Sequence, residues 1–150
     1  MSISEYWEQF LNACGKSADE VGFSGELEFE DTGVKGATQL SLVLSGKKTV
    51  SFSAFEAYGI NREPLPVSDE LYIVKDKSGE PRAIIELTDV NVVPFCDIPW
   101  ELAQREGEDE NLSDWRDKQR EIMEDEAATC GFTFTDSSKV VCELFHVIYQ

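Results

Sequence analysis

Apolar residues recur at helical spacing in two segments of the first third of the chain. The first stripe is rich in aromatic residues and predicts a helix over 5–13, with Ser4 as its N-cap. The second stripe is aliphatic and predicts a helix over 37–45. Gly46 ends that helix, because glycine tolerates a positive φ. Between the two helices, glycines predict that residues 16–36 are mostly loop.

Further along the chain, apolar and polar residues alternate with the period of a strand. This alternation predicts strands at 49–55, 71–74, 82–93 and 140–149. A lysine- and glycine-containing turn at 75–79 joins two of them as a hairpin. A shorter apolar piece lies at 27–29, and the piece at 131–134 is read as one more short strand.

The connections between these strands are predicted to hold one long loop and two helices. Residues 59–69 contain Gly, Asn and two Pro and are predicted to be a loop. Pro99 is well suited to the first turn of a helix through about Glu106. Ser113 is the expected cap of the next helix. Because strands outnumber helices, we expect one α+β domain over 1–150, with a mostly antiparallel sheet curled toward a small β-barrel and flanked by helices.

The charge of the chain changes the choice of partner. Thirteen Lys and Arg stand against 30 Asp and Glu, which gives a net charge of −17. Such an acidic surface repels a phosphate backbone, so long DNA is not an expected partner. A basic pocket could still act locally, because charges are screened beyond about 8–10 Å at physiological salt. A small nucleoside or a short RNA therefore stays possible as a partner.

Several other classes of protein are not expected. The four cysteines form no C-x-x-C pair and the chain has one histidine, so we expect no metal site and no cofactor. Scattered thiols without a leader segment are typical of a cytoplasmic protein. No apolar run approaches the ~18 residues of a membrane span, so we expect no membrane partner. The oligomeric state stays open.

Two marked segments lie far apart in the sequence. The first is Gly46-Lys47-Lys48-Thr49, at a helix-to-strand junction, and the second is Ala103-Gln104-Arg105-Glu106, followed by Leu112-Ser113-Asp114-Trp115. If the two segments meet, a lysine, a hydroxyl and a carboxylate share one cleft. That set can move protons and stabilise a developing oxyanion.

These segments, in this order, resemble the ASCH family (activating signal cointegrator-1 homology domains), and more narrowly a bacterial stand-alone subgroup of about this length. The resemblance implies a β-barrel similar to the PUA domain, with helices around it. It also implies a nucleoside-directed hydrolase, since some ASCH proteins are small metal-free amidohydrolases. Those enzymes remove an acyl group from the exocyclic amine of a cytidine nucleoside, as in N4-acetylcytidine.

The resemblance also implies catalytic roles for Lys48, Ser51 and Glu106. Lys48 would activate the nucleophile, Ser51 would be the nucleophile or an orienting hydroxyl, and Glu106 would pass a proton to the leaving amine. The enzymes of the family carry threonine where this chain has Ser51. Local sequence alone also allows Lys48 simply to favour a helix C-terminus. Glu108 remains an alternative to Glu106 as the acid of the site.

The predicted substrate-binding residues are hydroxyl, aromatic and charged side chains near these segments. Tyr58 and Trp115 are candidate stacking faces for a base, although a core role is the simpler interpretation of Trp115. The subgroup often carries histidine four residues after this tryptophan, where this chain has Gln119. The full set is Thr49, Ser53, Tyr58, Arg62, Glu108 and Trp115.

Two other classes of function stay open beside the amidohydrolase. One is an RNA-binding module or ribonuclease of the PUA-like class, against which the net charge argues. The other is a non-catalytic sensor with a pocket for a nucleotide-like ligand. A lysine with an ordinary pKa in a pocket that binds nucleosides would favour the sensor.

Overall fold

A five-stranded sheet forms the centre of the computed structural model, which describes residues 1–29 and 34–150. The strand order is β1-β3-β4-β5-β2, with β1 parallel to β3 and every other pair antiparallel. The strands are β1 (Gly25–Leu27), β2 (Val50–Ala54), β3 (Leu71–Lys75), β4 (Pro81–Pro94) and β5 (Lys139–Tyr149). Residues 30–33, part of the predicted loop at 16–36, lie outside the described residues.

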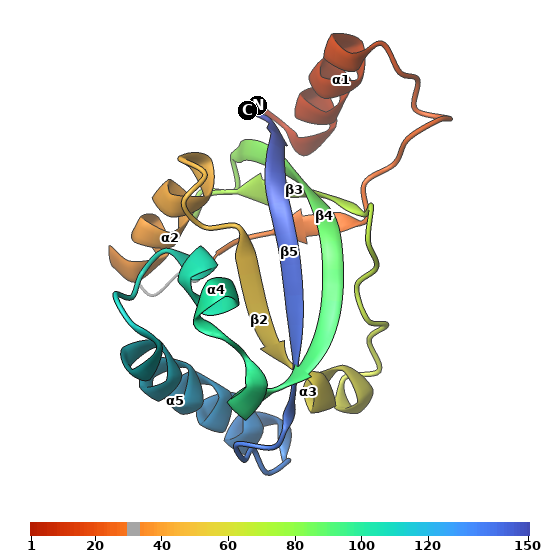
Figure 1. Ribbon diagram of the computed structural model, residues 1–150. Helices are drawn as coiled ribbons and strands as arrows, with labels where there is room; N and C mark the ends of the chain where they lie inside the picture. Colours follow the sequence, from red (N-terminus) through yellow and green to blue (C-terminus); the bar gives the residue numbers. More distant parts are fainter. Residues whose placement is uncertain (30–33) are drawn as a thin grey trace.

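Helices flank this sheet unevenly. In Figure 1, α2, α4 and α5 gather along one side of the curled sheet, and α1 lies apart from them near the two chain ends. The helices are α1 (Ile3–Cys14), α2 (Val34–Leu44), α3 (Phe55–Ile60), α4 (Trp100–Ala103) and α5 (Leu112–Cys130), with short 3-10 turns η1 (Phe95–Asp97) and η2 (Gln104–Glu106). The α+β class and the curled, barrel-like sheet that we predicted are both confirmed.

Three groups of buried apolar residues attach the helices to the sheet. The aromatic stripe of α1 packs on Ile73 and Ile84 of the β3–β4 hairpin. Val43 of α2 packs on Val74, Ile85 and Phe145, on three adjacent strands. The buried side chains of α5 pack in one cluster with Val140 and Cys142 of β5. The sheet therefore fixes α2 and α5 relative to β2, the strand that follows Lys48.

The helix starts differ from those predicted. Ser2, not Ser4, caps α1, because its hydroxyl accepts from the Glu5 amide while the Glu5 carboxylate accepts from the Ser2 amide. Asn111, not Ser113, caps α5, and its side chain accepts a 2.9 Å hydrogen bond from the Asp114 amide. In both cases a second good capping residue stood within two positions, and local sequence could not rank them.

The structure departs from the prediction after β2 and after α5. The predicted strand 49–55 ends at Ala54, and the chain then forms α3, a helix that was not predicted and that overlaps the start of the predicted loop 59–69. Ala54 and Ala57 share a buried cluster with Ala127 of α5. Residues 131–134 form no strand. There Phe134 is buried against the Phe95 ring, at 5.3 Å between centroids, so its apolar character serves the core rather than the sheet.

Candidate functional site

Backbone hydrogen bonding joins the two sequence segments that were expected to meet. The Thr49 amide donates a 2.8 Å hydrogen bond to the Arg105 carbonyl. In return, Nε of Arg105 donates a 2.9 Å hydrogen bond to the Thr49 hydroxyl. The Thr49 side chain thereby holds the η2 turn against the start of β2, and its role in substrate binding stays a prediction.

Gly107 makes this close approach possible. Its φ is +84°, and a Cβ added there would lie 3.1 Å from the Lys47 carbonyl oxygen. Few residues other than glycine adopt that φ without strain. The chain can therefore pass directly over Lys47. This crossing brings Glu106, which precedes Gly107, opposite Lys48, which follows Lys47.

We expect Gly107→Ala to lower the free energy of unfolding by about 2–3 kcal/mol, from left-handed strain plus the backbone contact. Gly131→Ala is the matched control, because Gly131 has φ +87° and nothing lies within 4 Å of its added Cβ. That variant should lose only about 1 kcal/mol. Urea unfolding of both proteins measures the difference, and equal losses would contradict the role of the Lys47 contact.

Lys48 and Glu106 form a buried ion pair at this junction. Nζ of Lys48 lies 3.7 Å from Oε2 of Glu106, and the two residues are 4 % and 5 % exposed. Burial lowers the pKa of the Lys48 ammonium below its usual value, although the Glu106 carboxylate partly opposes that shift. A lysine that gives up its proton more easily is suited to act as a base.

Glu106 has further partners on α5. Nε2 of Gln119 donates hydrogen bonds of 2.9 Å to both carboxylate oxygens of Glu106. Nζ of Lys118 lies 3.6 Å from Oε1 of Glu106 and contacts Glu108 and Asp109 at 2.8 and 2.6 Å. The position where the resembling subgroup often has histidine is thus part of the site, and here a neutral amide fills it.

Lys118 differs from Lys48 in the direction of its pKa shift. Burial alone would lower its pKa, but its hydrogen bonds to Asp109 and Glu108 hold the pKa above the usual value. Lys118 therefore remains charged and neutralises the acids beside it. Glu108, predicted as an alternative site acid, faces this ammonium.

A hollow of about 180 Å³ opens onto the ion pair. We call it the Lys48 hollow; its lining residues are Phe29, Gln39, Lys48, Ser51, Phe52, Glu106, Gln119 and Ile122. The structure therefore brings together Lys48, Ser51 and Glu106, the three predicted catalytic residues. Sequence reasoning missed Phe29, whose ring centroid lies 5.9 Å from Nζ of Lys48.

Ser53 and Tyr58 belong to a different hydrogen-bond network. The Ser53 hydroxyl and the Tyr58 hydroxyl are 2.7 Å apart, and Tyr58 also donates to Glu143 at 3.2 Å. Burial raises the pKa of Tyr58 to about 12. Tyr58 and Glu143 line a separate hollow of about 290 Å³. Arg62 is exposed after α3 and lines neither hollow.

Trp115 requires a correction. Its side chain is fully buried, with the rings of Phe52 and Phe95 centred 5.0 and 5.8 Å away. No face of the indole is open to a base, so the predicted stacking role is wrong. The apolar neighbours on β2 and η1 explain why: the ring is the centre of the cluster that attaches α5 to the sheet.

The described part of the chain has neither a candidate metal cluster nor a helix that could span a membrane. Within residues 1–29 and 34–150, no group of three or more His, Cys, Asp or Glu side chains is arranged to hold a metal ion. Over the same residues, no helix has the length and apolar character needed to cross a membrane. All four cysteines, which lie within these ranges, are free.

The family model of the ASCH domain matches residues 27–149, which include every residue of the Lys48 hollow. The chain belongs to the ASCH domain family. The family has an RNA-binding, PUA-like fold, and hydrolase activity has been proposed for some of its members. No curated protein matches the chain.

Solved structures agree with the ASCH assignment. The ASCH domain from Lactobacillus crispatus JV V101 is 25% identical, with a TM-score of 0.88, and the match covers 98% of this chain and 94% of that one. A protein from Enterococcus faecalis V583 is also 25% identical, with a TM-score of 0.87 over 98% and 88% of the two chains. A hypothetical protein, 14% identical at a TM-score of 0.51 over 83% and 98%, shares the fold alone.

Proposed function

We propose that this ASCH protein hydrolyses the amide bond of a cytidine-type nucleoside acylated on its exocyclic amine, with the chain's own side chains as catalysts. The observation that carries the proposal is the buried Lys48–Glu106 pair at the wall of a hollow that also contains Ser51. A base of lowered pKa, a hydroxyl and a carboxylate are the groups that acyl transfer from an amide needs.

The first half of the reaction uses Lys48 and Ser51. Neutral Lys48 takes the proton of the Ser51 hydroxyl as its oxygen attacks the acyl carbon, and the new ammonium then faces the developing oxyanion. Glu106, held by Gln119, accepts this proton from Lys48 and passes it to the departing amine of the base. The carbon–nitrogen bond breaks, and the acyl group remains on Ser51.

Water completes the cycle in the second half. Lys48, neutral again, takes a proton from a water molecule as the water oxygen attacks the acyl-serine ester. The ester bond breaks, the proton returns to the Ser51 oxygen, and the carboxylic acid leaves. If Ser51 only orients water, Lys48 takes a proton from that water as the water oxygen attacks the amide carbon. Glu106 then passes the proton to the leaving amine, and no acyl-enzyme forms.

Release of cytidine from N4-acetylcytidine by the pure protein tests the proposal. We expect turnover that follows Michaelis–Menten kinetics and that falls sharply when Lys48 is replaced. Turnover no higher than that of a Lys48→Ala variant would contradict the proposed mechanism. A preparation that releases no cytidine at all would overturn the amidohydrolase proposal.

Ser51 offers a test of the nucleophile. We expect Ser51→Ala to lower kcat by at least ~100-fold, because the hydroxyl is lost, and Ser51→Thr to stay within about tenfold, because the hydroxyl is kept with a stiffer rotamer. Steady-state kinetics and intact-mass detection of an acyl-enzyme measure both points. Full activity in Ser51→Ala would remove Ser51 from the mechanism.

The RNA-binding character of the family fold favours a second candidate, a module for short RNA. The net charge of −17 opposes tight phosphate contacts. We therefore expect no binding to duplex or long single-stranded RNA at physiological salt. Fluorescence anisotropy at increasing salt checks this: affinity that falls steeply with salt would establish phosphate contacts and favour the RNA module instead.

A further inference from the structure

Strand β2 passes from the Lys48 hollow to a second hollow within two residues. Ser51 and Ser53 project from the same face of the strand, about 7 Å apart along it. Ser51 lines the Lys48 hollow, whereas the Ser53 hydroxyl contacts the Tyr58 hydroxyl at 2.7 Å. Tyr58 in turn lines the hollow of about 290 Å³, which we call the Tyr58 hollow. A ligand that is attacked at Ser51 can therefore extend from one hollow into the other.

Glu143 lies opposite Ser51 on the neighbouring strand. The two residues pair across β2 and β5, and such pairs project from the same face with Cβ atoms about 4.5–5.5 Å apart. The Glu143 side chain lines the Tyr58 hollow, where Oε1 accepts a 3.2 Å hydrogen bond from the Tyr58 hydroxyl. Because a tyrosine hydroxyl has one proton and gives it to Glu143, Ser53 must donate to Tyr58. This chain of hydrogen bonds fixes a carboxylate beside the proposed nucleophile.

The charge of Glu143 has no cation beside it. Among the described residues that line the Tyr58 hollow, none is Lys, Arg or His, and Tyr58 supplies only a neutral donor. Burial raises the pKa of Glu143 and the charge of Glu70 raises it further, although the hydrogen bond from Tyr58 opposes the shift. An ammonium group of a ligand would favour the ionised carboxylate. The rings of Tyr58 and Tyr72 line the same hollow and offer faces that attract a cation.

The proposed reaction decides which part of the substrate reaches Glu143. Glu106 passes a proton to the leaving amine, so that amine lies on the Glu106 side of the attacked carbon. The acyl arm leaves the same carbon in another direction and is the part free to enter the Tyr58 hollow. We infer that Glu143 is a specificity-determining residue for an acyl arm that carries an ammonium group.

This inference rests on the proposed function and adds the class of the acyl group to it. The substrate is an aminoacyl amide of a cytidine-type nucleoside. Water cleaves the same carbon–nitrogen bond, so the acyl carbon gains the hydroxyl of the released amino acid and the amine gains the hydrogen. A simple acetyl group reacts by the same steps but leaves the Tyr58 hollow unused.

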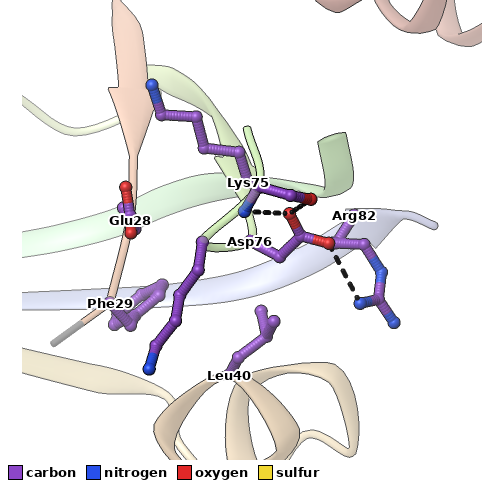
Figure 2. Close-up of a pocket in the computed structure, with 8 residues that line it drawn as sticks. Glu28, Phe29, Leu40, Lys75, Asp76 and Arg82 are labelled. Atoms are coloured by element: carbon purple, nitrogen blue, oxygen red, sulfur yellow. Dashed lines mark hydrogen bonds and ion pairs between the residues drawn. The ribbon is translucent and has the colours of Figure 1, made fainter. Parts of the chain in front are cut away.

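The other hollow beside the Lys48 hollow is less suited to a cationic arm. It has a volume of about 370 Å³ and shares Phe29 with the Lys48 hollow. Figure 2 shows Leu40 of α2 in its lining, and Asp76 joined to Arg82 by a dashed line. That ion pair measures 3.6 Å, so the Asp76 carboxylate already has a counter-ion. Two further cationic side chains, Lys75 and Lys77, line the same space. A cationic arm would meet like charges there.

Analogues that cannot be hydrolysed test the inference without turnover. N4-(2-aminoethyl)cytidine and N4-propylcytidine have arms of equal size that differ by one ammonium group. N4-(3-aminopropyl)cytidine and N4-butylcytidine form a second such pair, one carbon longer. In at least one pair we expect the ammonium analogue to bind at least ~10-fold more tightly than its neutral partner, as for a hydrogen bond between charged groups. Isothermal titration calorimetry near neutral pH gives the four affinities.

Variants assign this preference to one carboxylate. Glu143→Gln keeps the size of the side chain and an acceptor for Tyr58 but removes the charge, so the ratio of the two affinities should fall to within about threefold. Glu124→Gln removes the same charge at an exposed position on α5 and should keep the full ratio. Equal affinities within both pairs, no measurable binding of any analogue, or a preference that survives Glu143→Gln would overturn the inference.

Hydrolysis separates this inference from the proposed function. We expect kcat/KM for N4-glycylcytidine or N4-(β-alanyl)cytidine, whichever matches the preferred analogue, to exceed that for its neutral isostere, the propionyl or butyryl amide, by at least ~10-fold. Hydrolysis of aminoacyl and neutral amides at equal rates would overturn the inference and leave the amidohydrolase proposal standing. The expected binding preference without hydrolysis of any amide would retain Glu143 as the cation-binding residue and reject the amidohydrolase proposal alone.

Discussion

We expect Lys48→Met to lower kcat/KM for N4-acetylcytidine by about 10²–10⁴-fold, the range that a positioned acid–base group contributes. Methionine fills the space of the lysine stem but cannot accept a proton. Glu106 keeps its hydrogen bonds from Gln119 and its contact with Lys118, so the buried carboxylate is not left alone. The variant should therefore fold, with one cooperative thermal transition.

Lys47→Met is the control for that experiment. Lys47 is adjacent in sequence and carries the same charge, but its side chain is exposed and does not line the Lys48 hollow. We expect its kcat/KM to stay within about twofold of the parent, as for a surface change away from the chemistry. Equal activity of the two variants, or an equal loss in both, would remove Lys48 from its role as base.

The pH profile gives an independent check on the same residue. Because burial lowers the pKa of Lys48, the neutral amine becomes populated at a pH below the usual lysine range. Activity should rise with pH through that lowered pKa and then level off. A Ser51→Thr enzyme should keep this rising limb, since Lys48 is intact. A flat profile, or a limb only at the ordinary pKa of lysine, would speak against a desolvated base.

The same shift has a defined sign for stability. The folded state holds the Lys48 proton less tightly than the unfolded state does. Between the lowered folded pKa and the ordinary unfolded pKa, the unfolded chain binds more protons, so the contribution of Lys48 to the free energy of unfolding rises with pH. Below the folded pKa this contribution is constant and unfavourable. In Lys48→Met the pH dependence of stability should lose this rise.

The fold class and the three predicted catalytic residues were inferred from the sequence for different reasons. Alternation predicted β3, β4 and β5 to within one residue at each end, because their apolar faces are buried against helices. Lys48, Ser51 and Glu106 came from motif resemblance, and their roles remain predictions. Nothing local could have joined them: the contact depends on Gly107 passing over Lys47, a feature of tertiary structure.

The sequence could not show which aromatic residues line the site and which belong to the core. Phe29 and Trp115 are both aromatic residues near polar segments, yet Phe29 lines the Lys48 hollow and Trp115 is fully buried. Only the packing of α5 on β2 separates the two cases. Gln119 was marked for its departure from histidine, but its pair of hydrogen bonds to Glu106 required coordinates.

Glu106 and Glu108 were left as alternatives, and the structure makes their difference testable. We expect Glu106→Gln to lower kcat by about 10²–10⁴-fold, because the proton path from Lys48 to the leaving amine is broken. Glu108→Gln should change kcat by no more than about threefold, since Glu108 contacts Lys118 and does not line the Lys48 hollow. The two changes are chemically identical and two residues apart, which makes each the control for the other.

Leaving-group dependence separates a proton donor from a structural partner of Lys48. If Glu106 delivers the proton to the amine, the defect of Glu106→Gln should shrink for substrates whose amine needs less protonation to leave. An activated aryl ester of acetic acid, whose phenolate leaves without a proton, is such a substrate. Equal defects on the amide and the ester would mean that Glu106 only holds Lys48 in place. A larger defect in Glu108→Gln than in Glu106→Gln would transfer the acid role to Glu108.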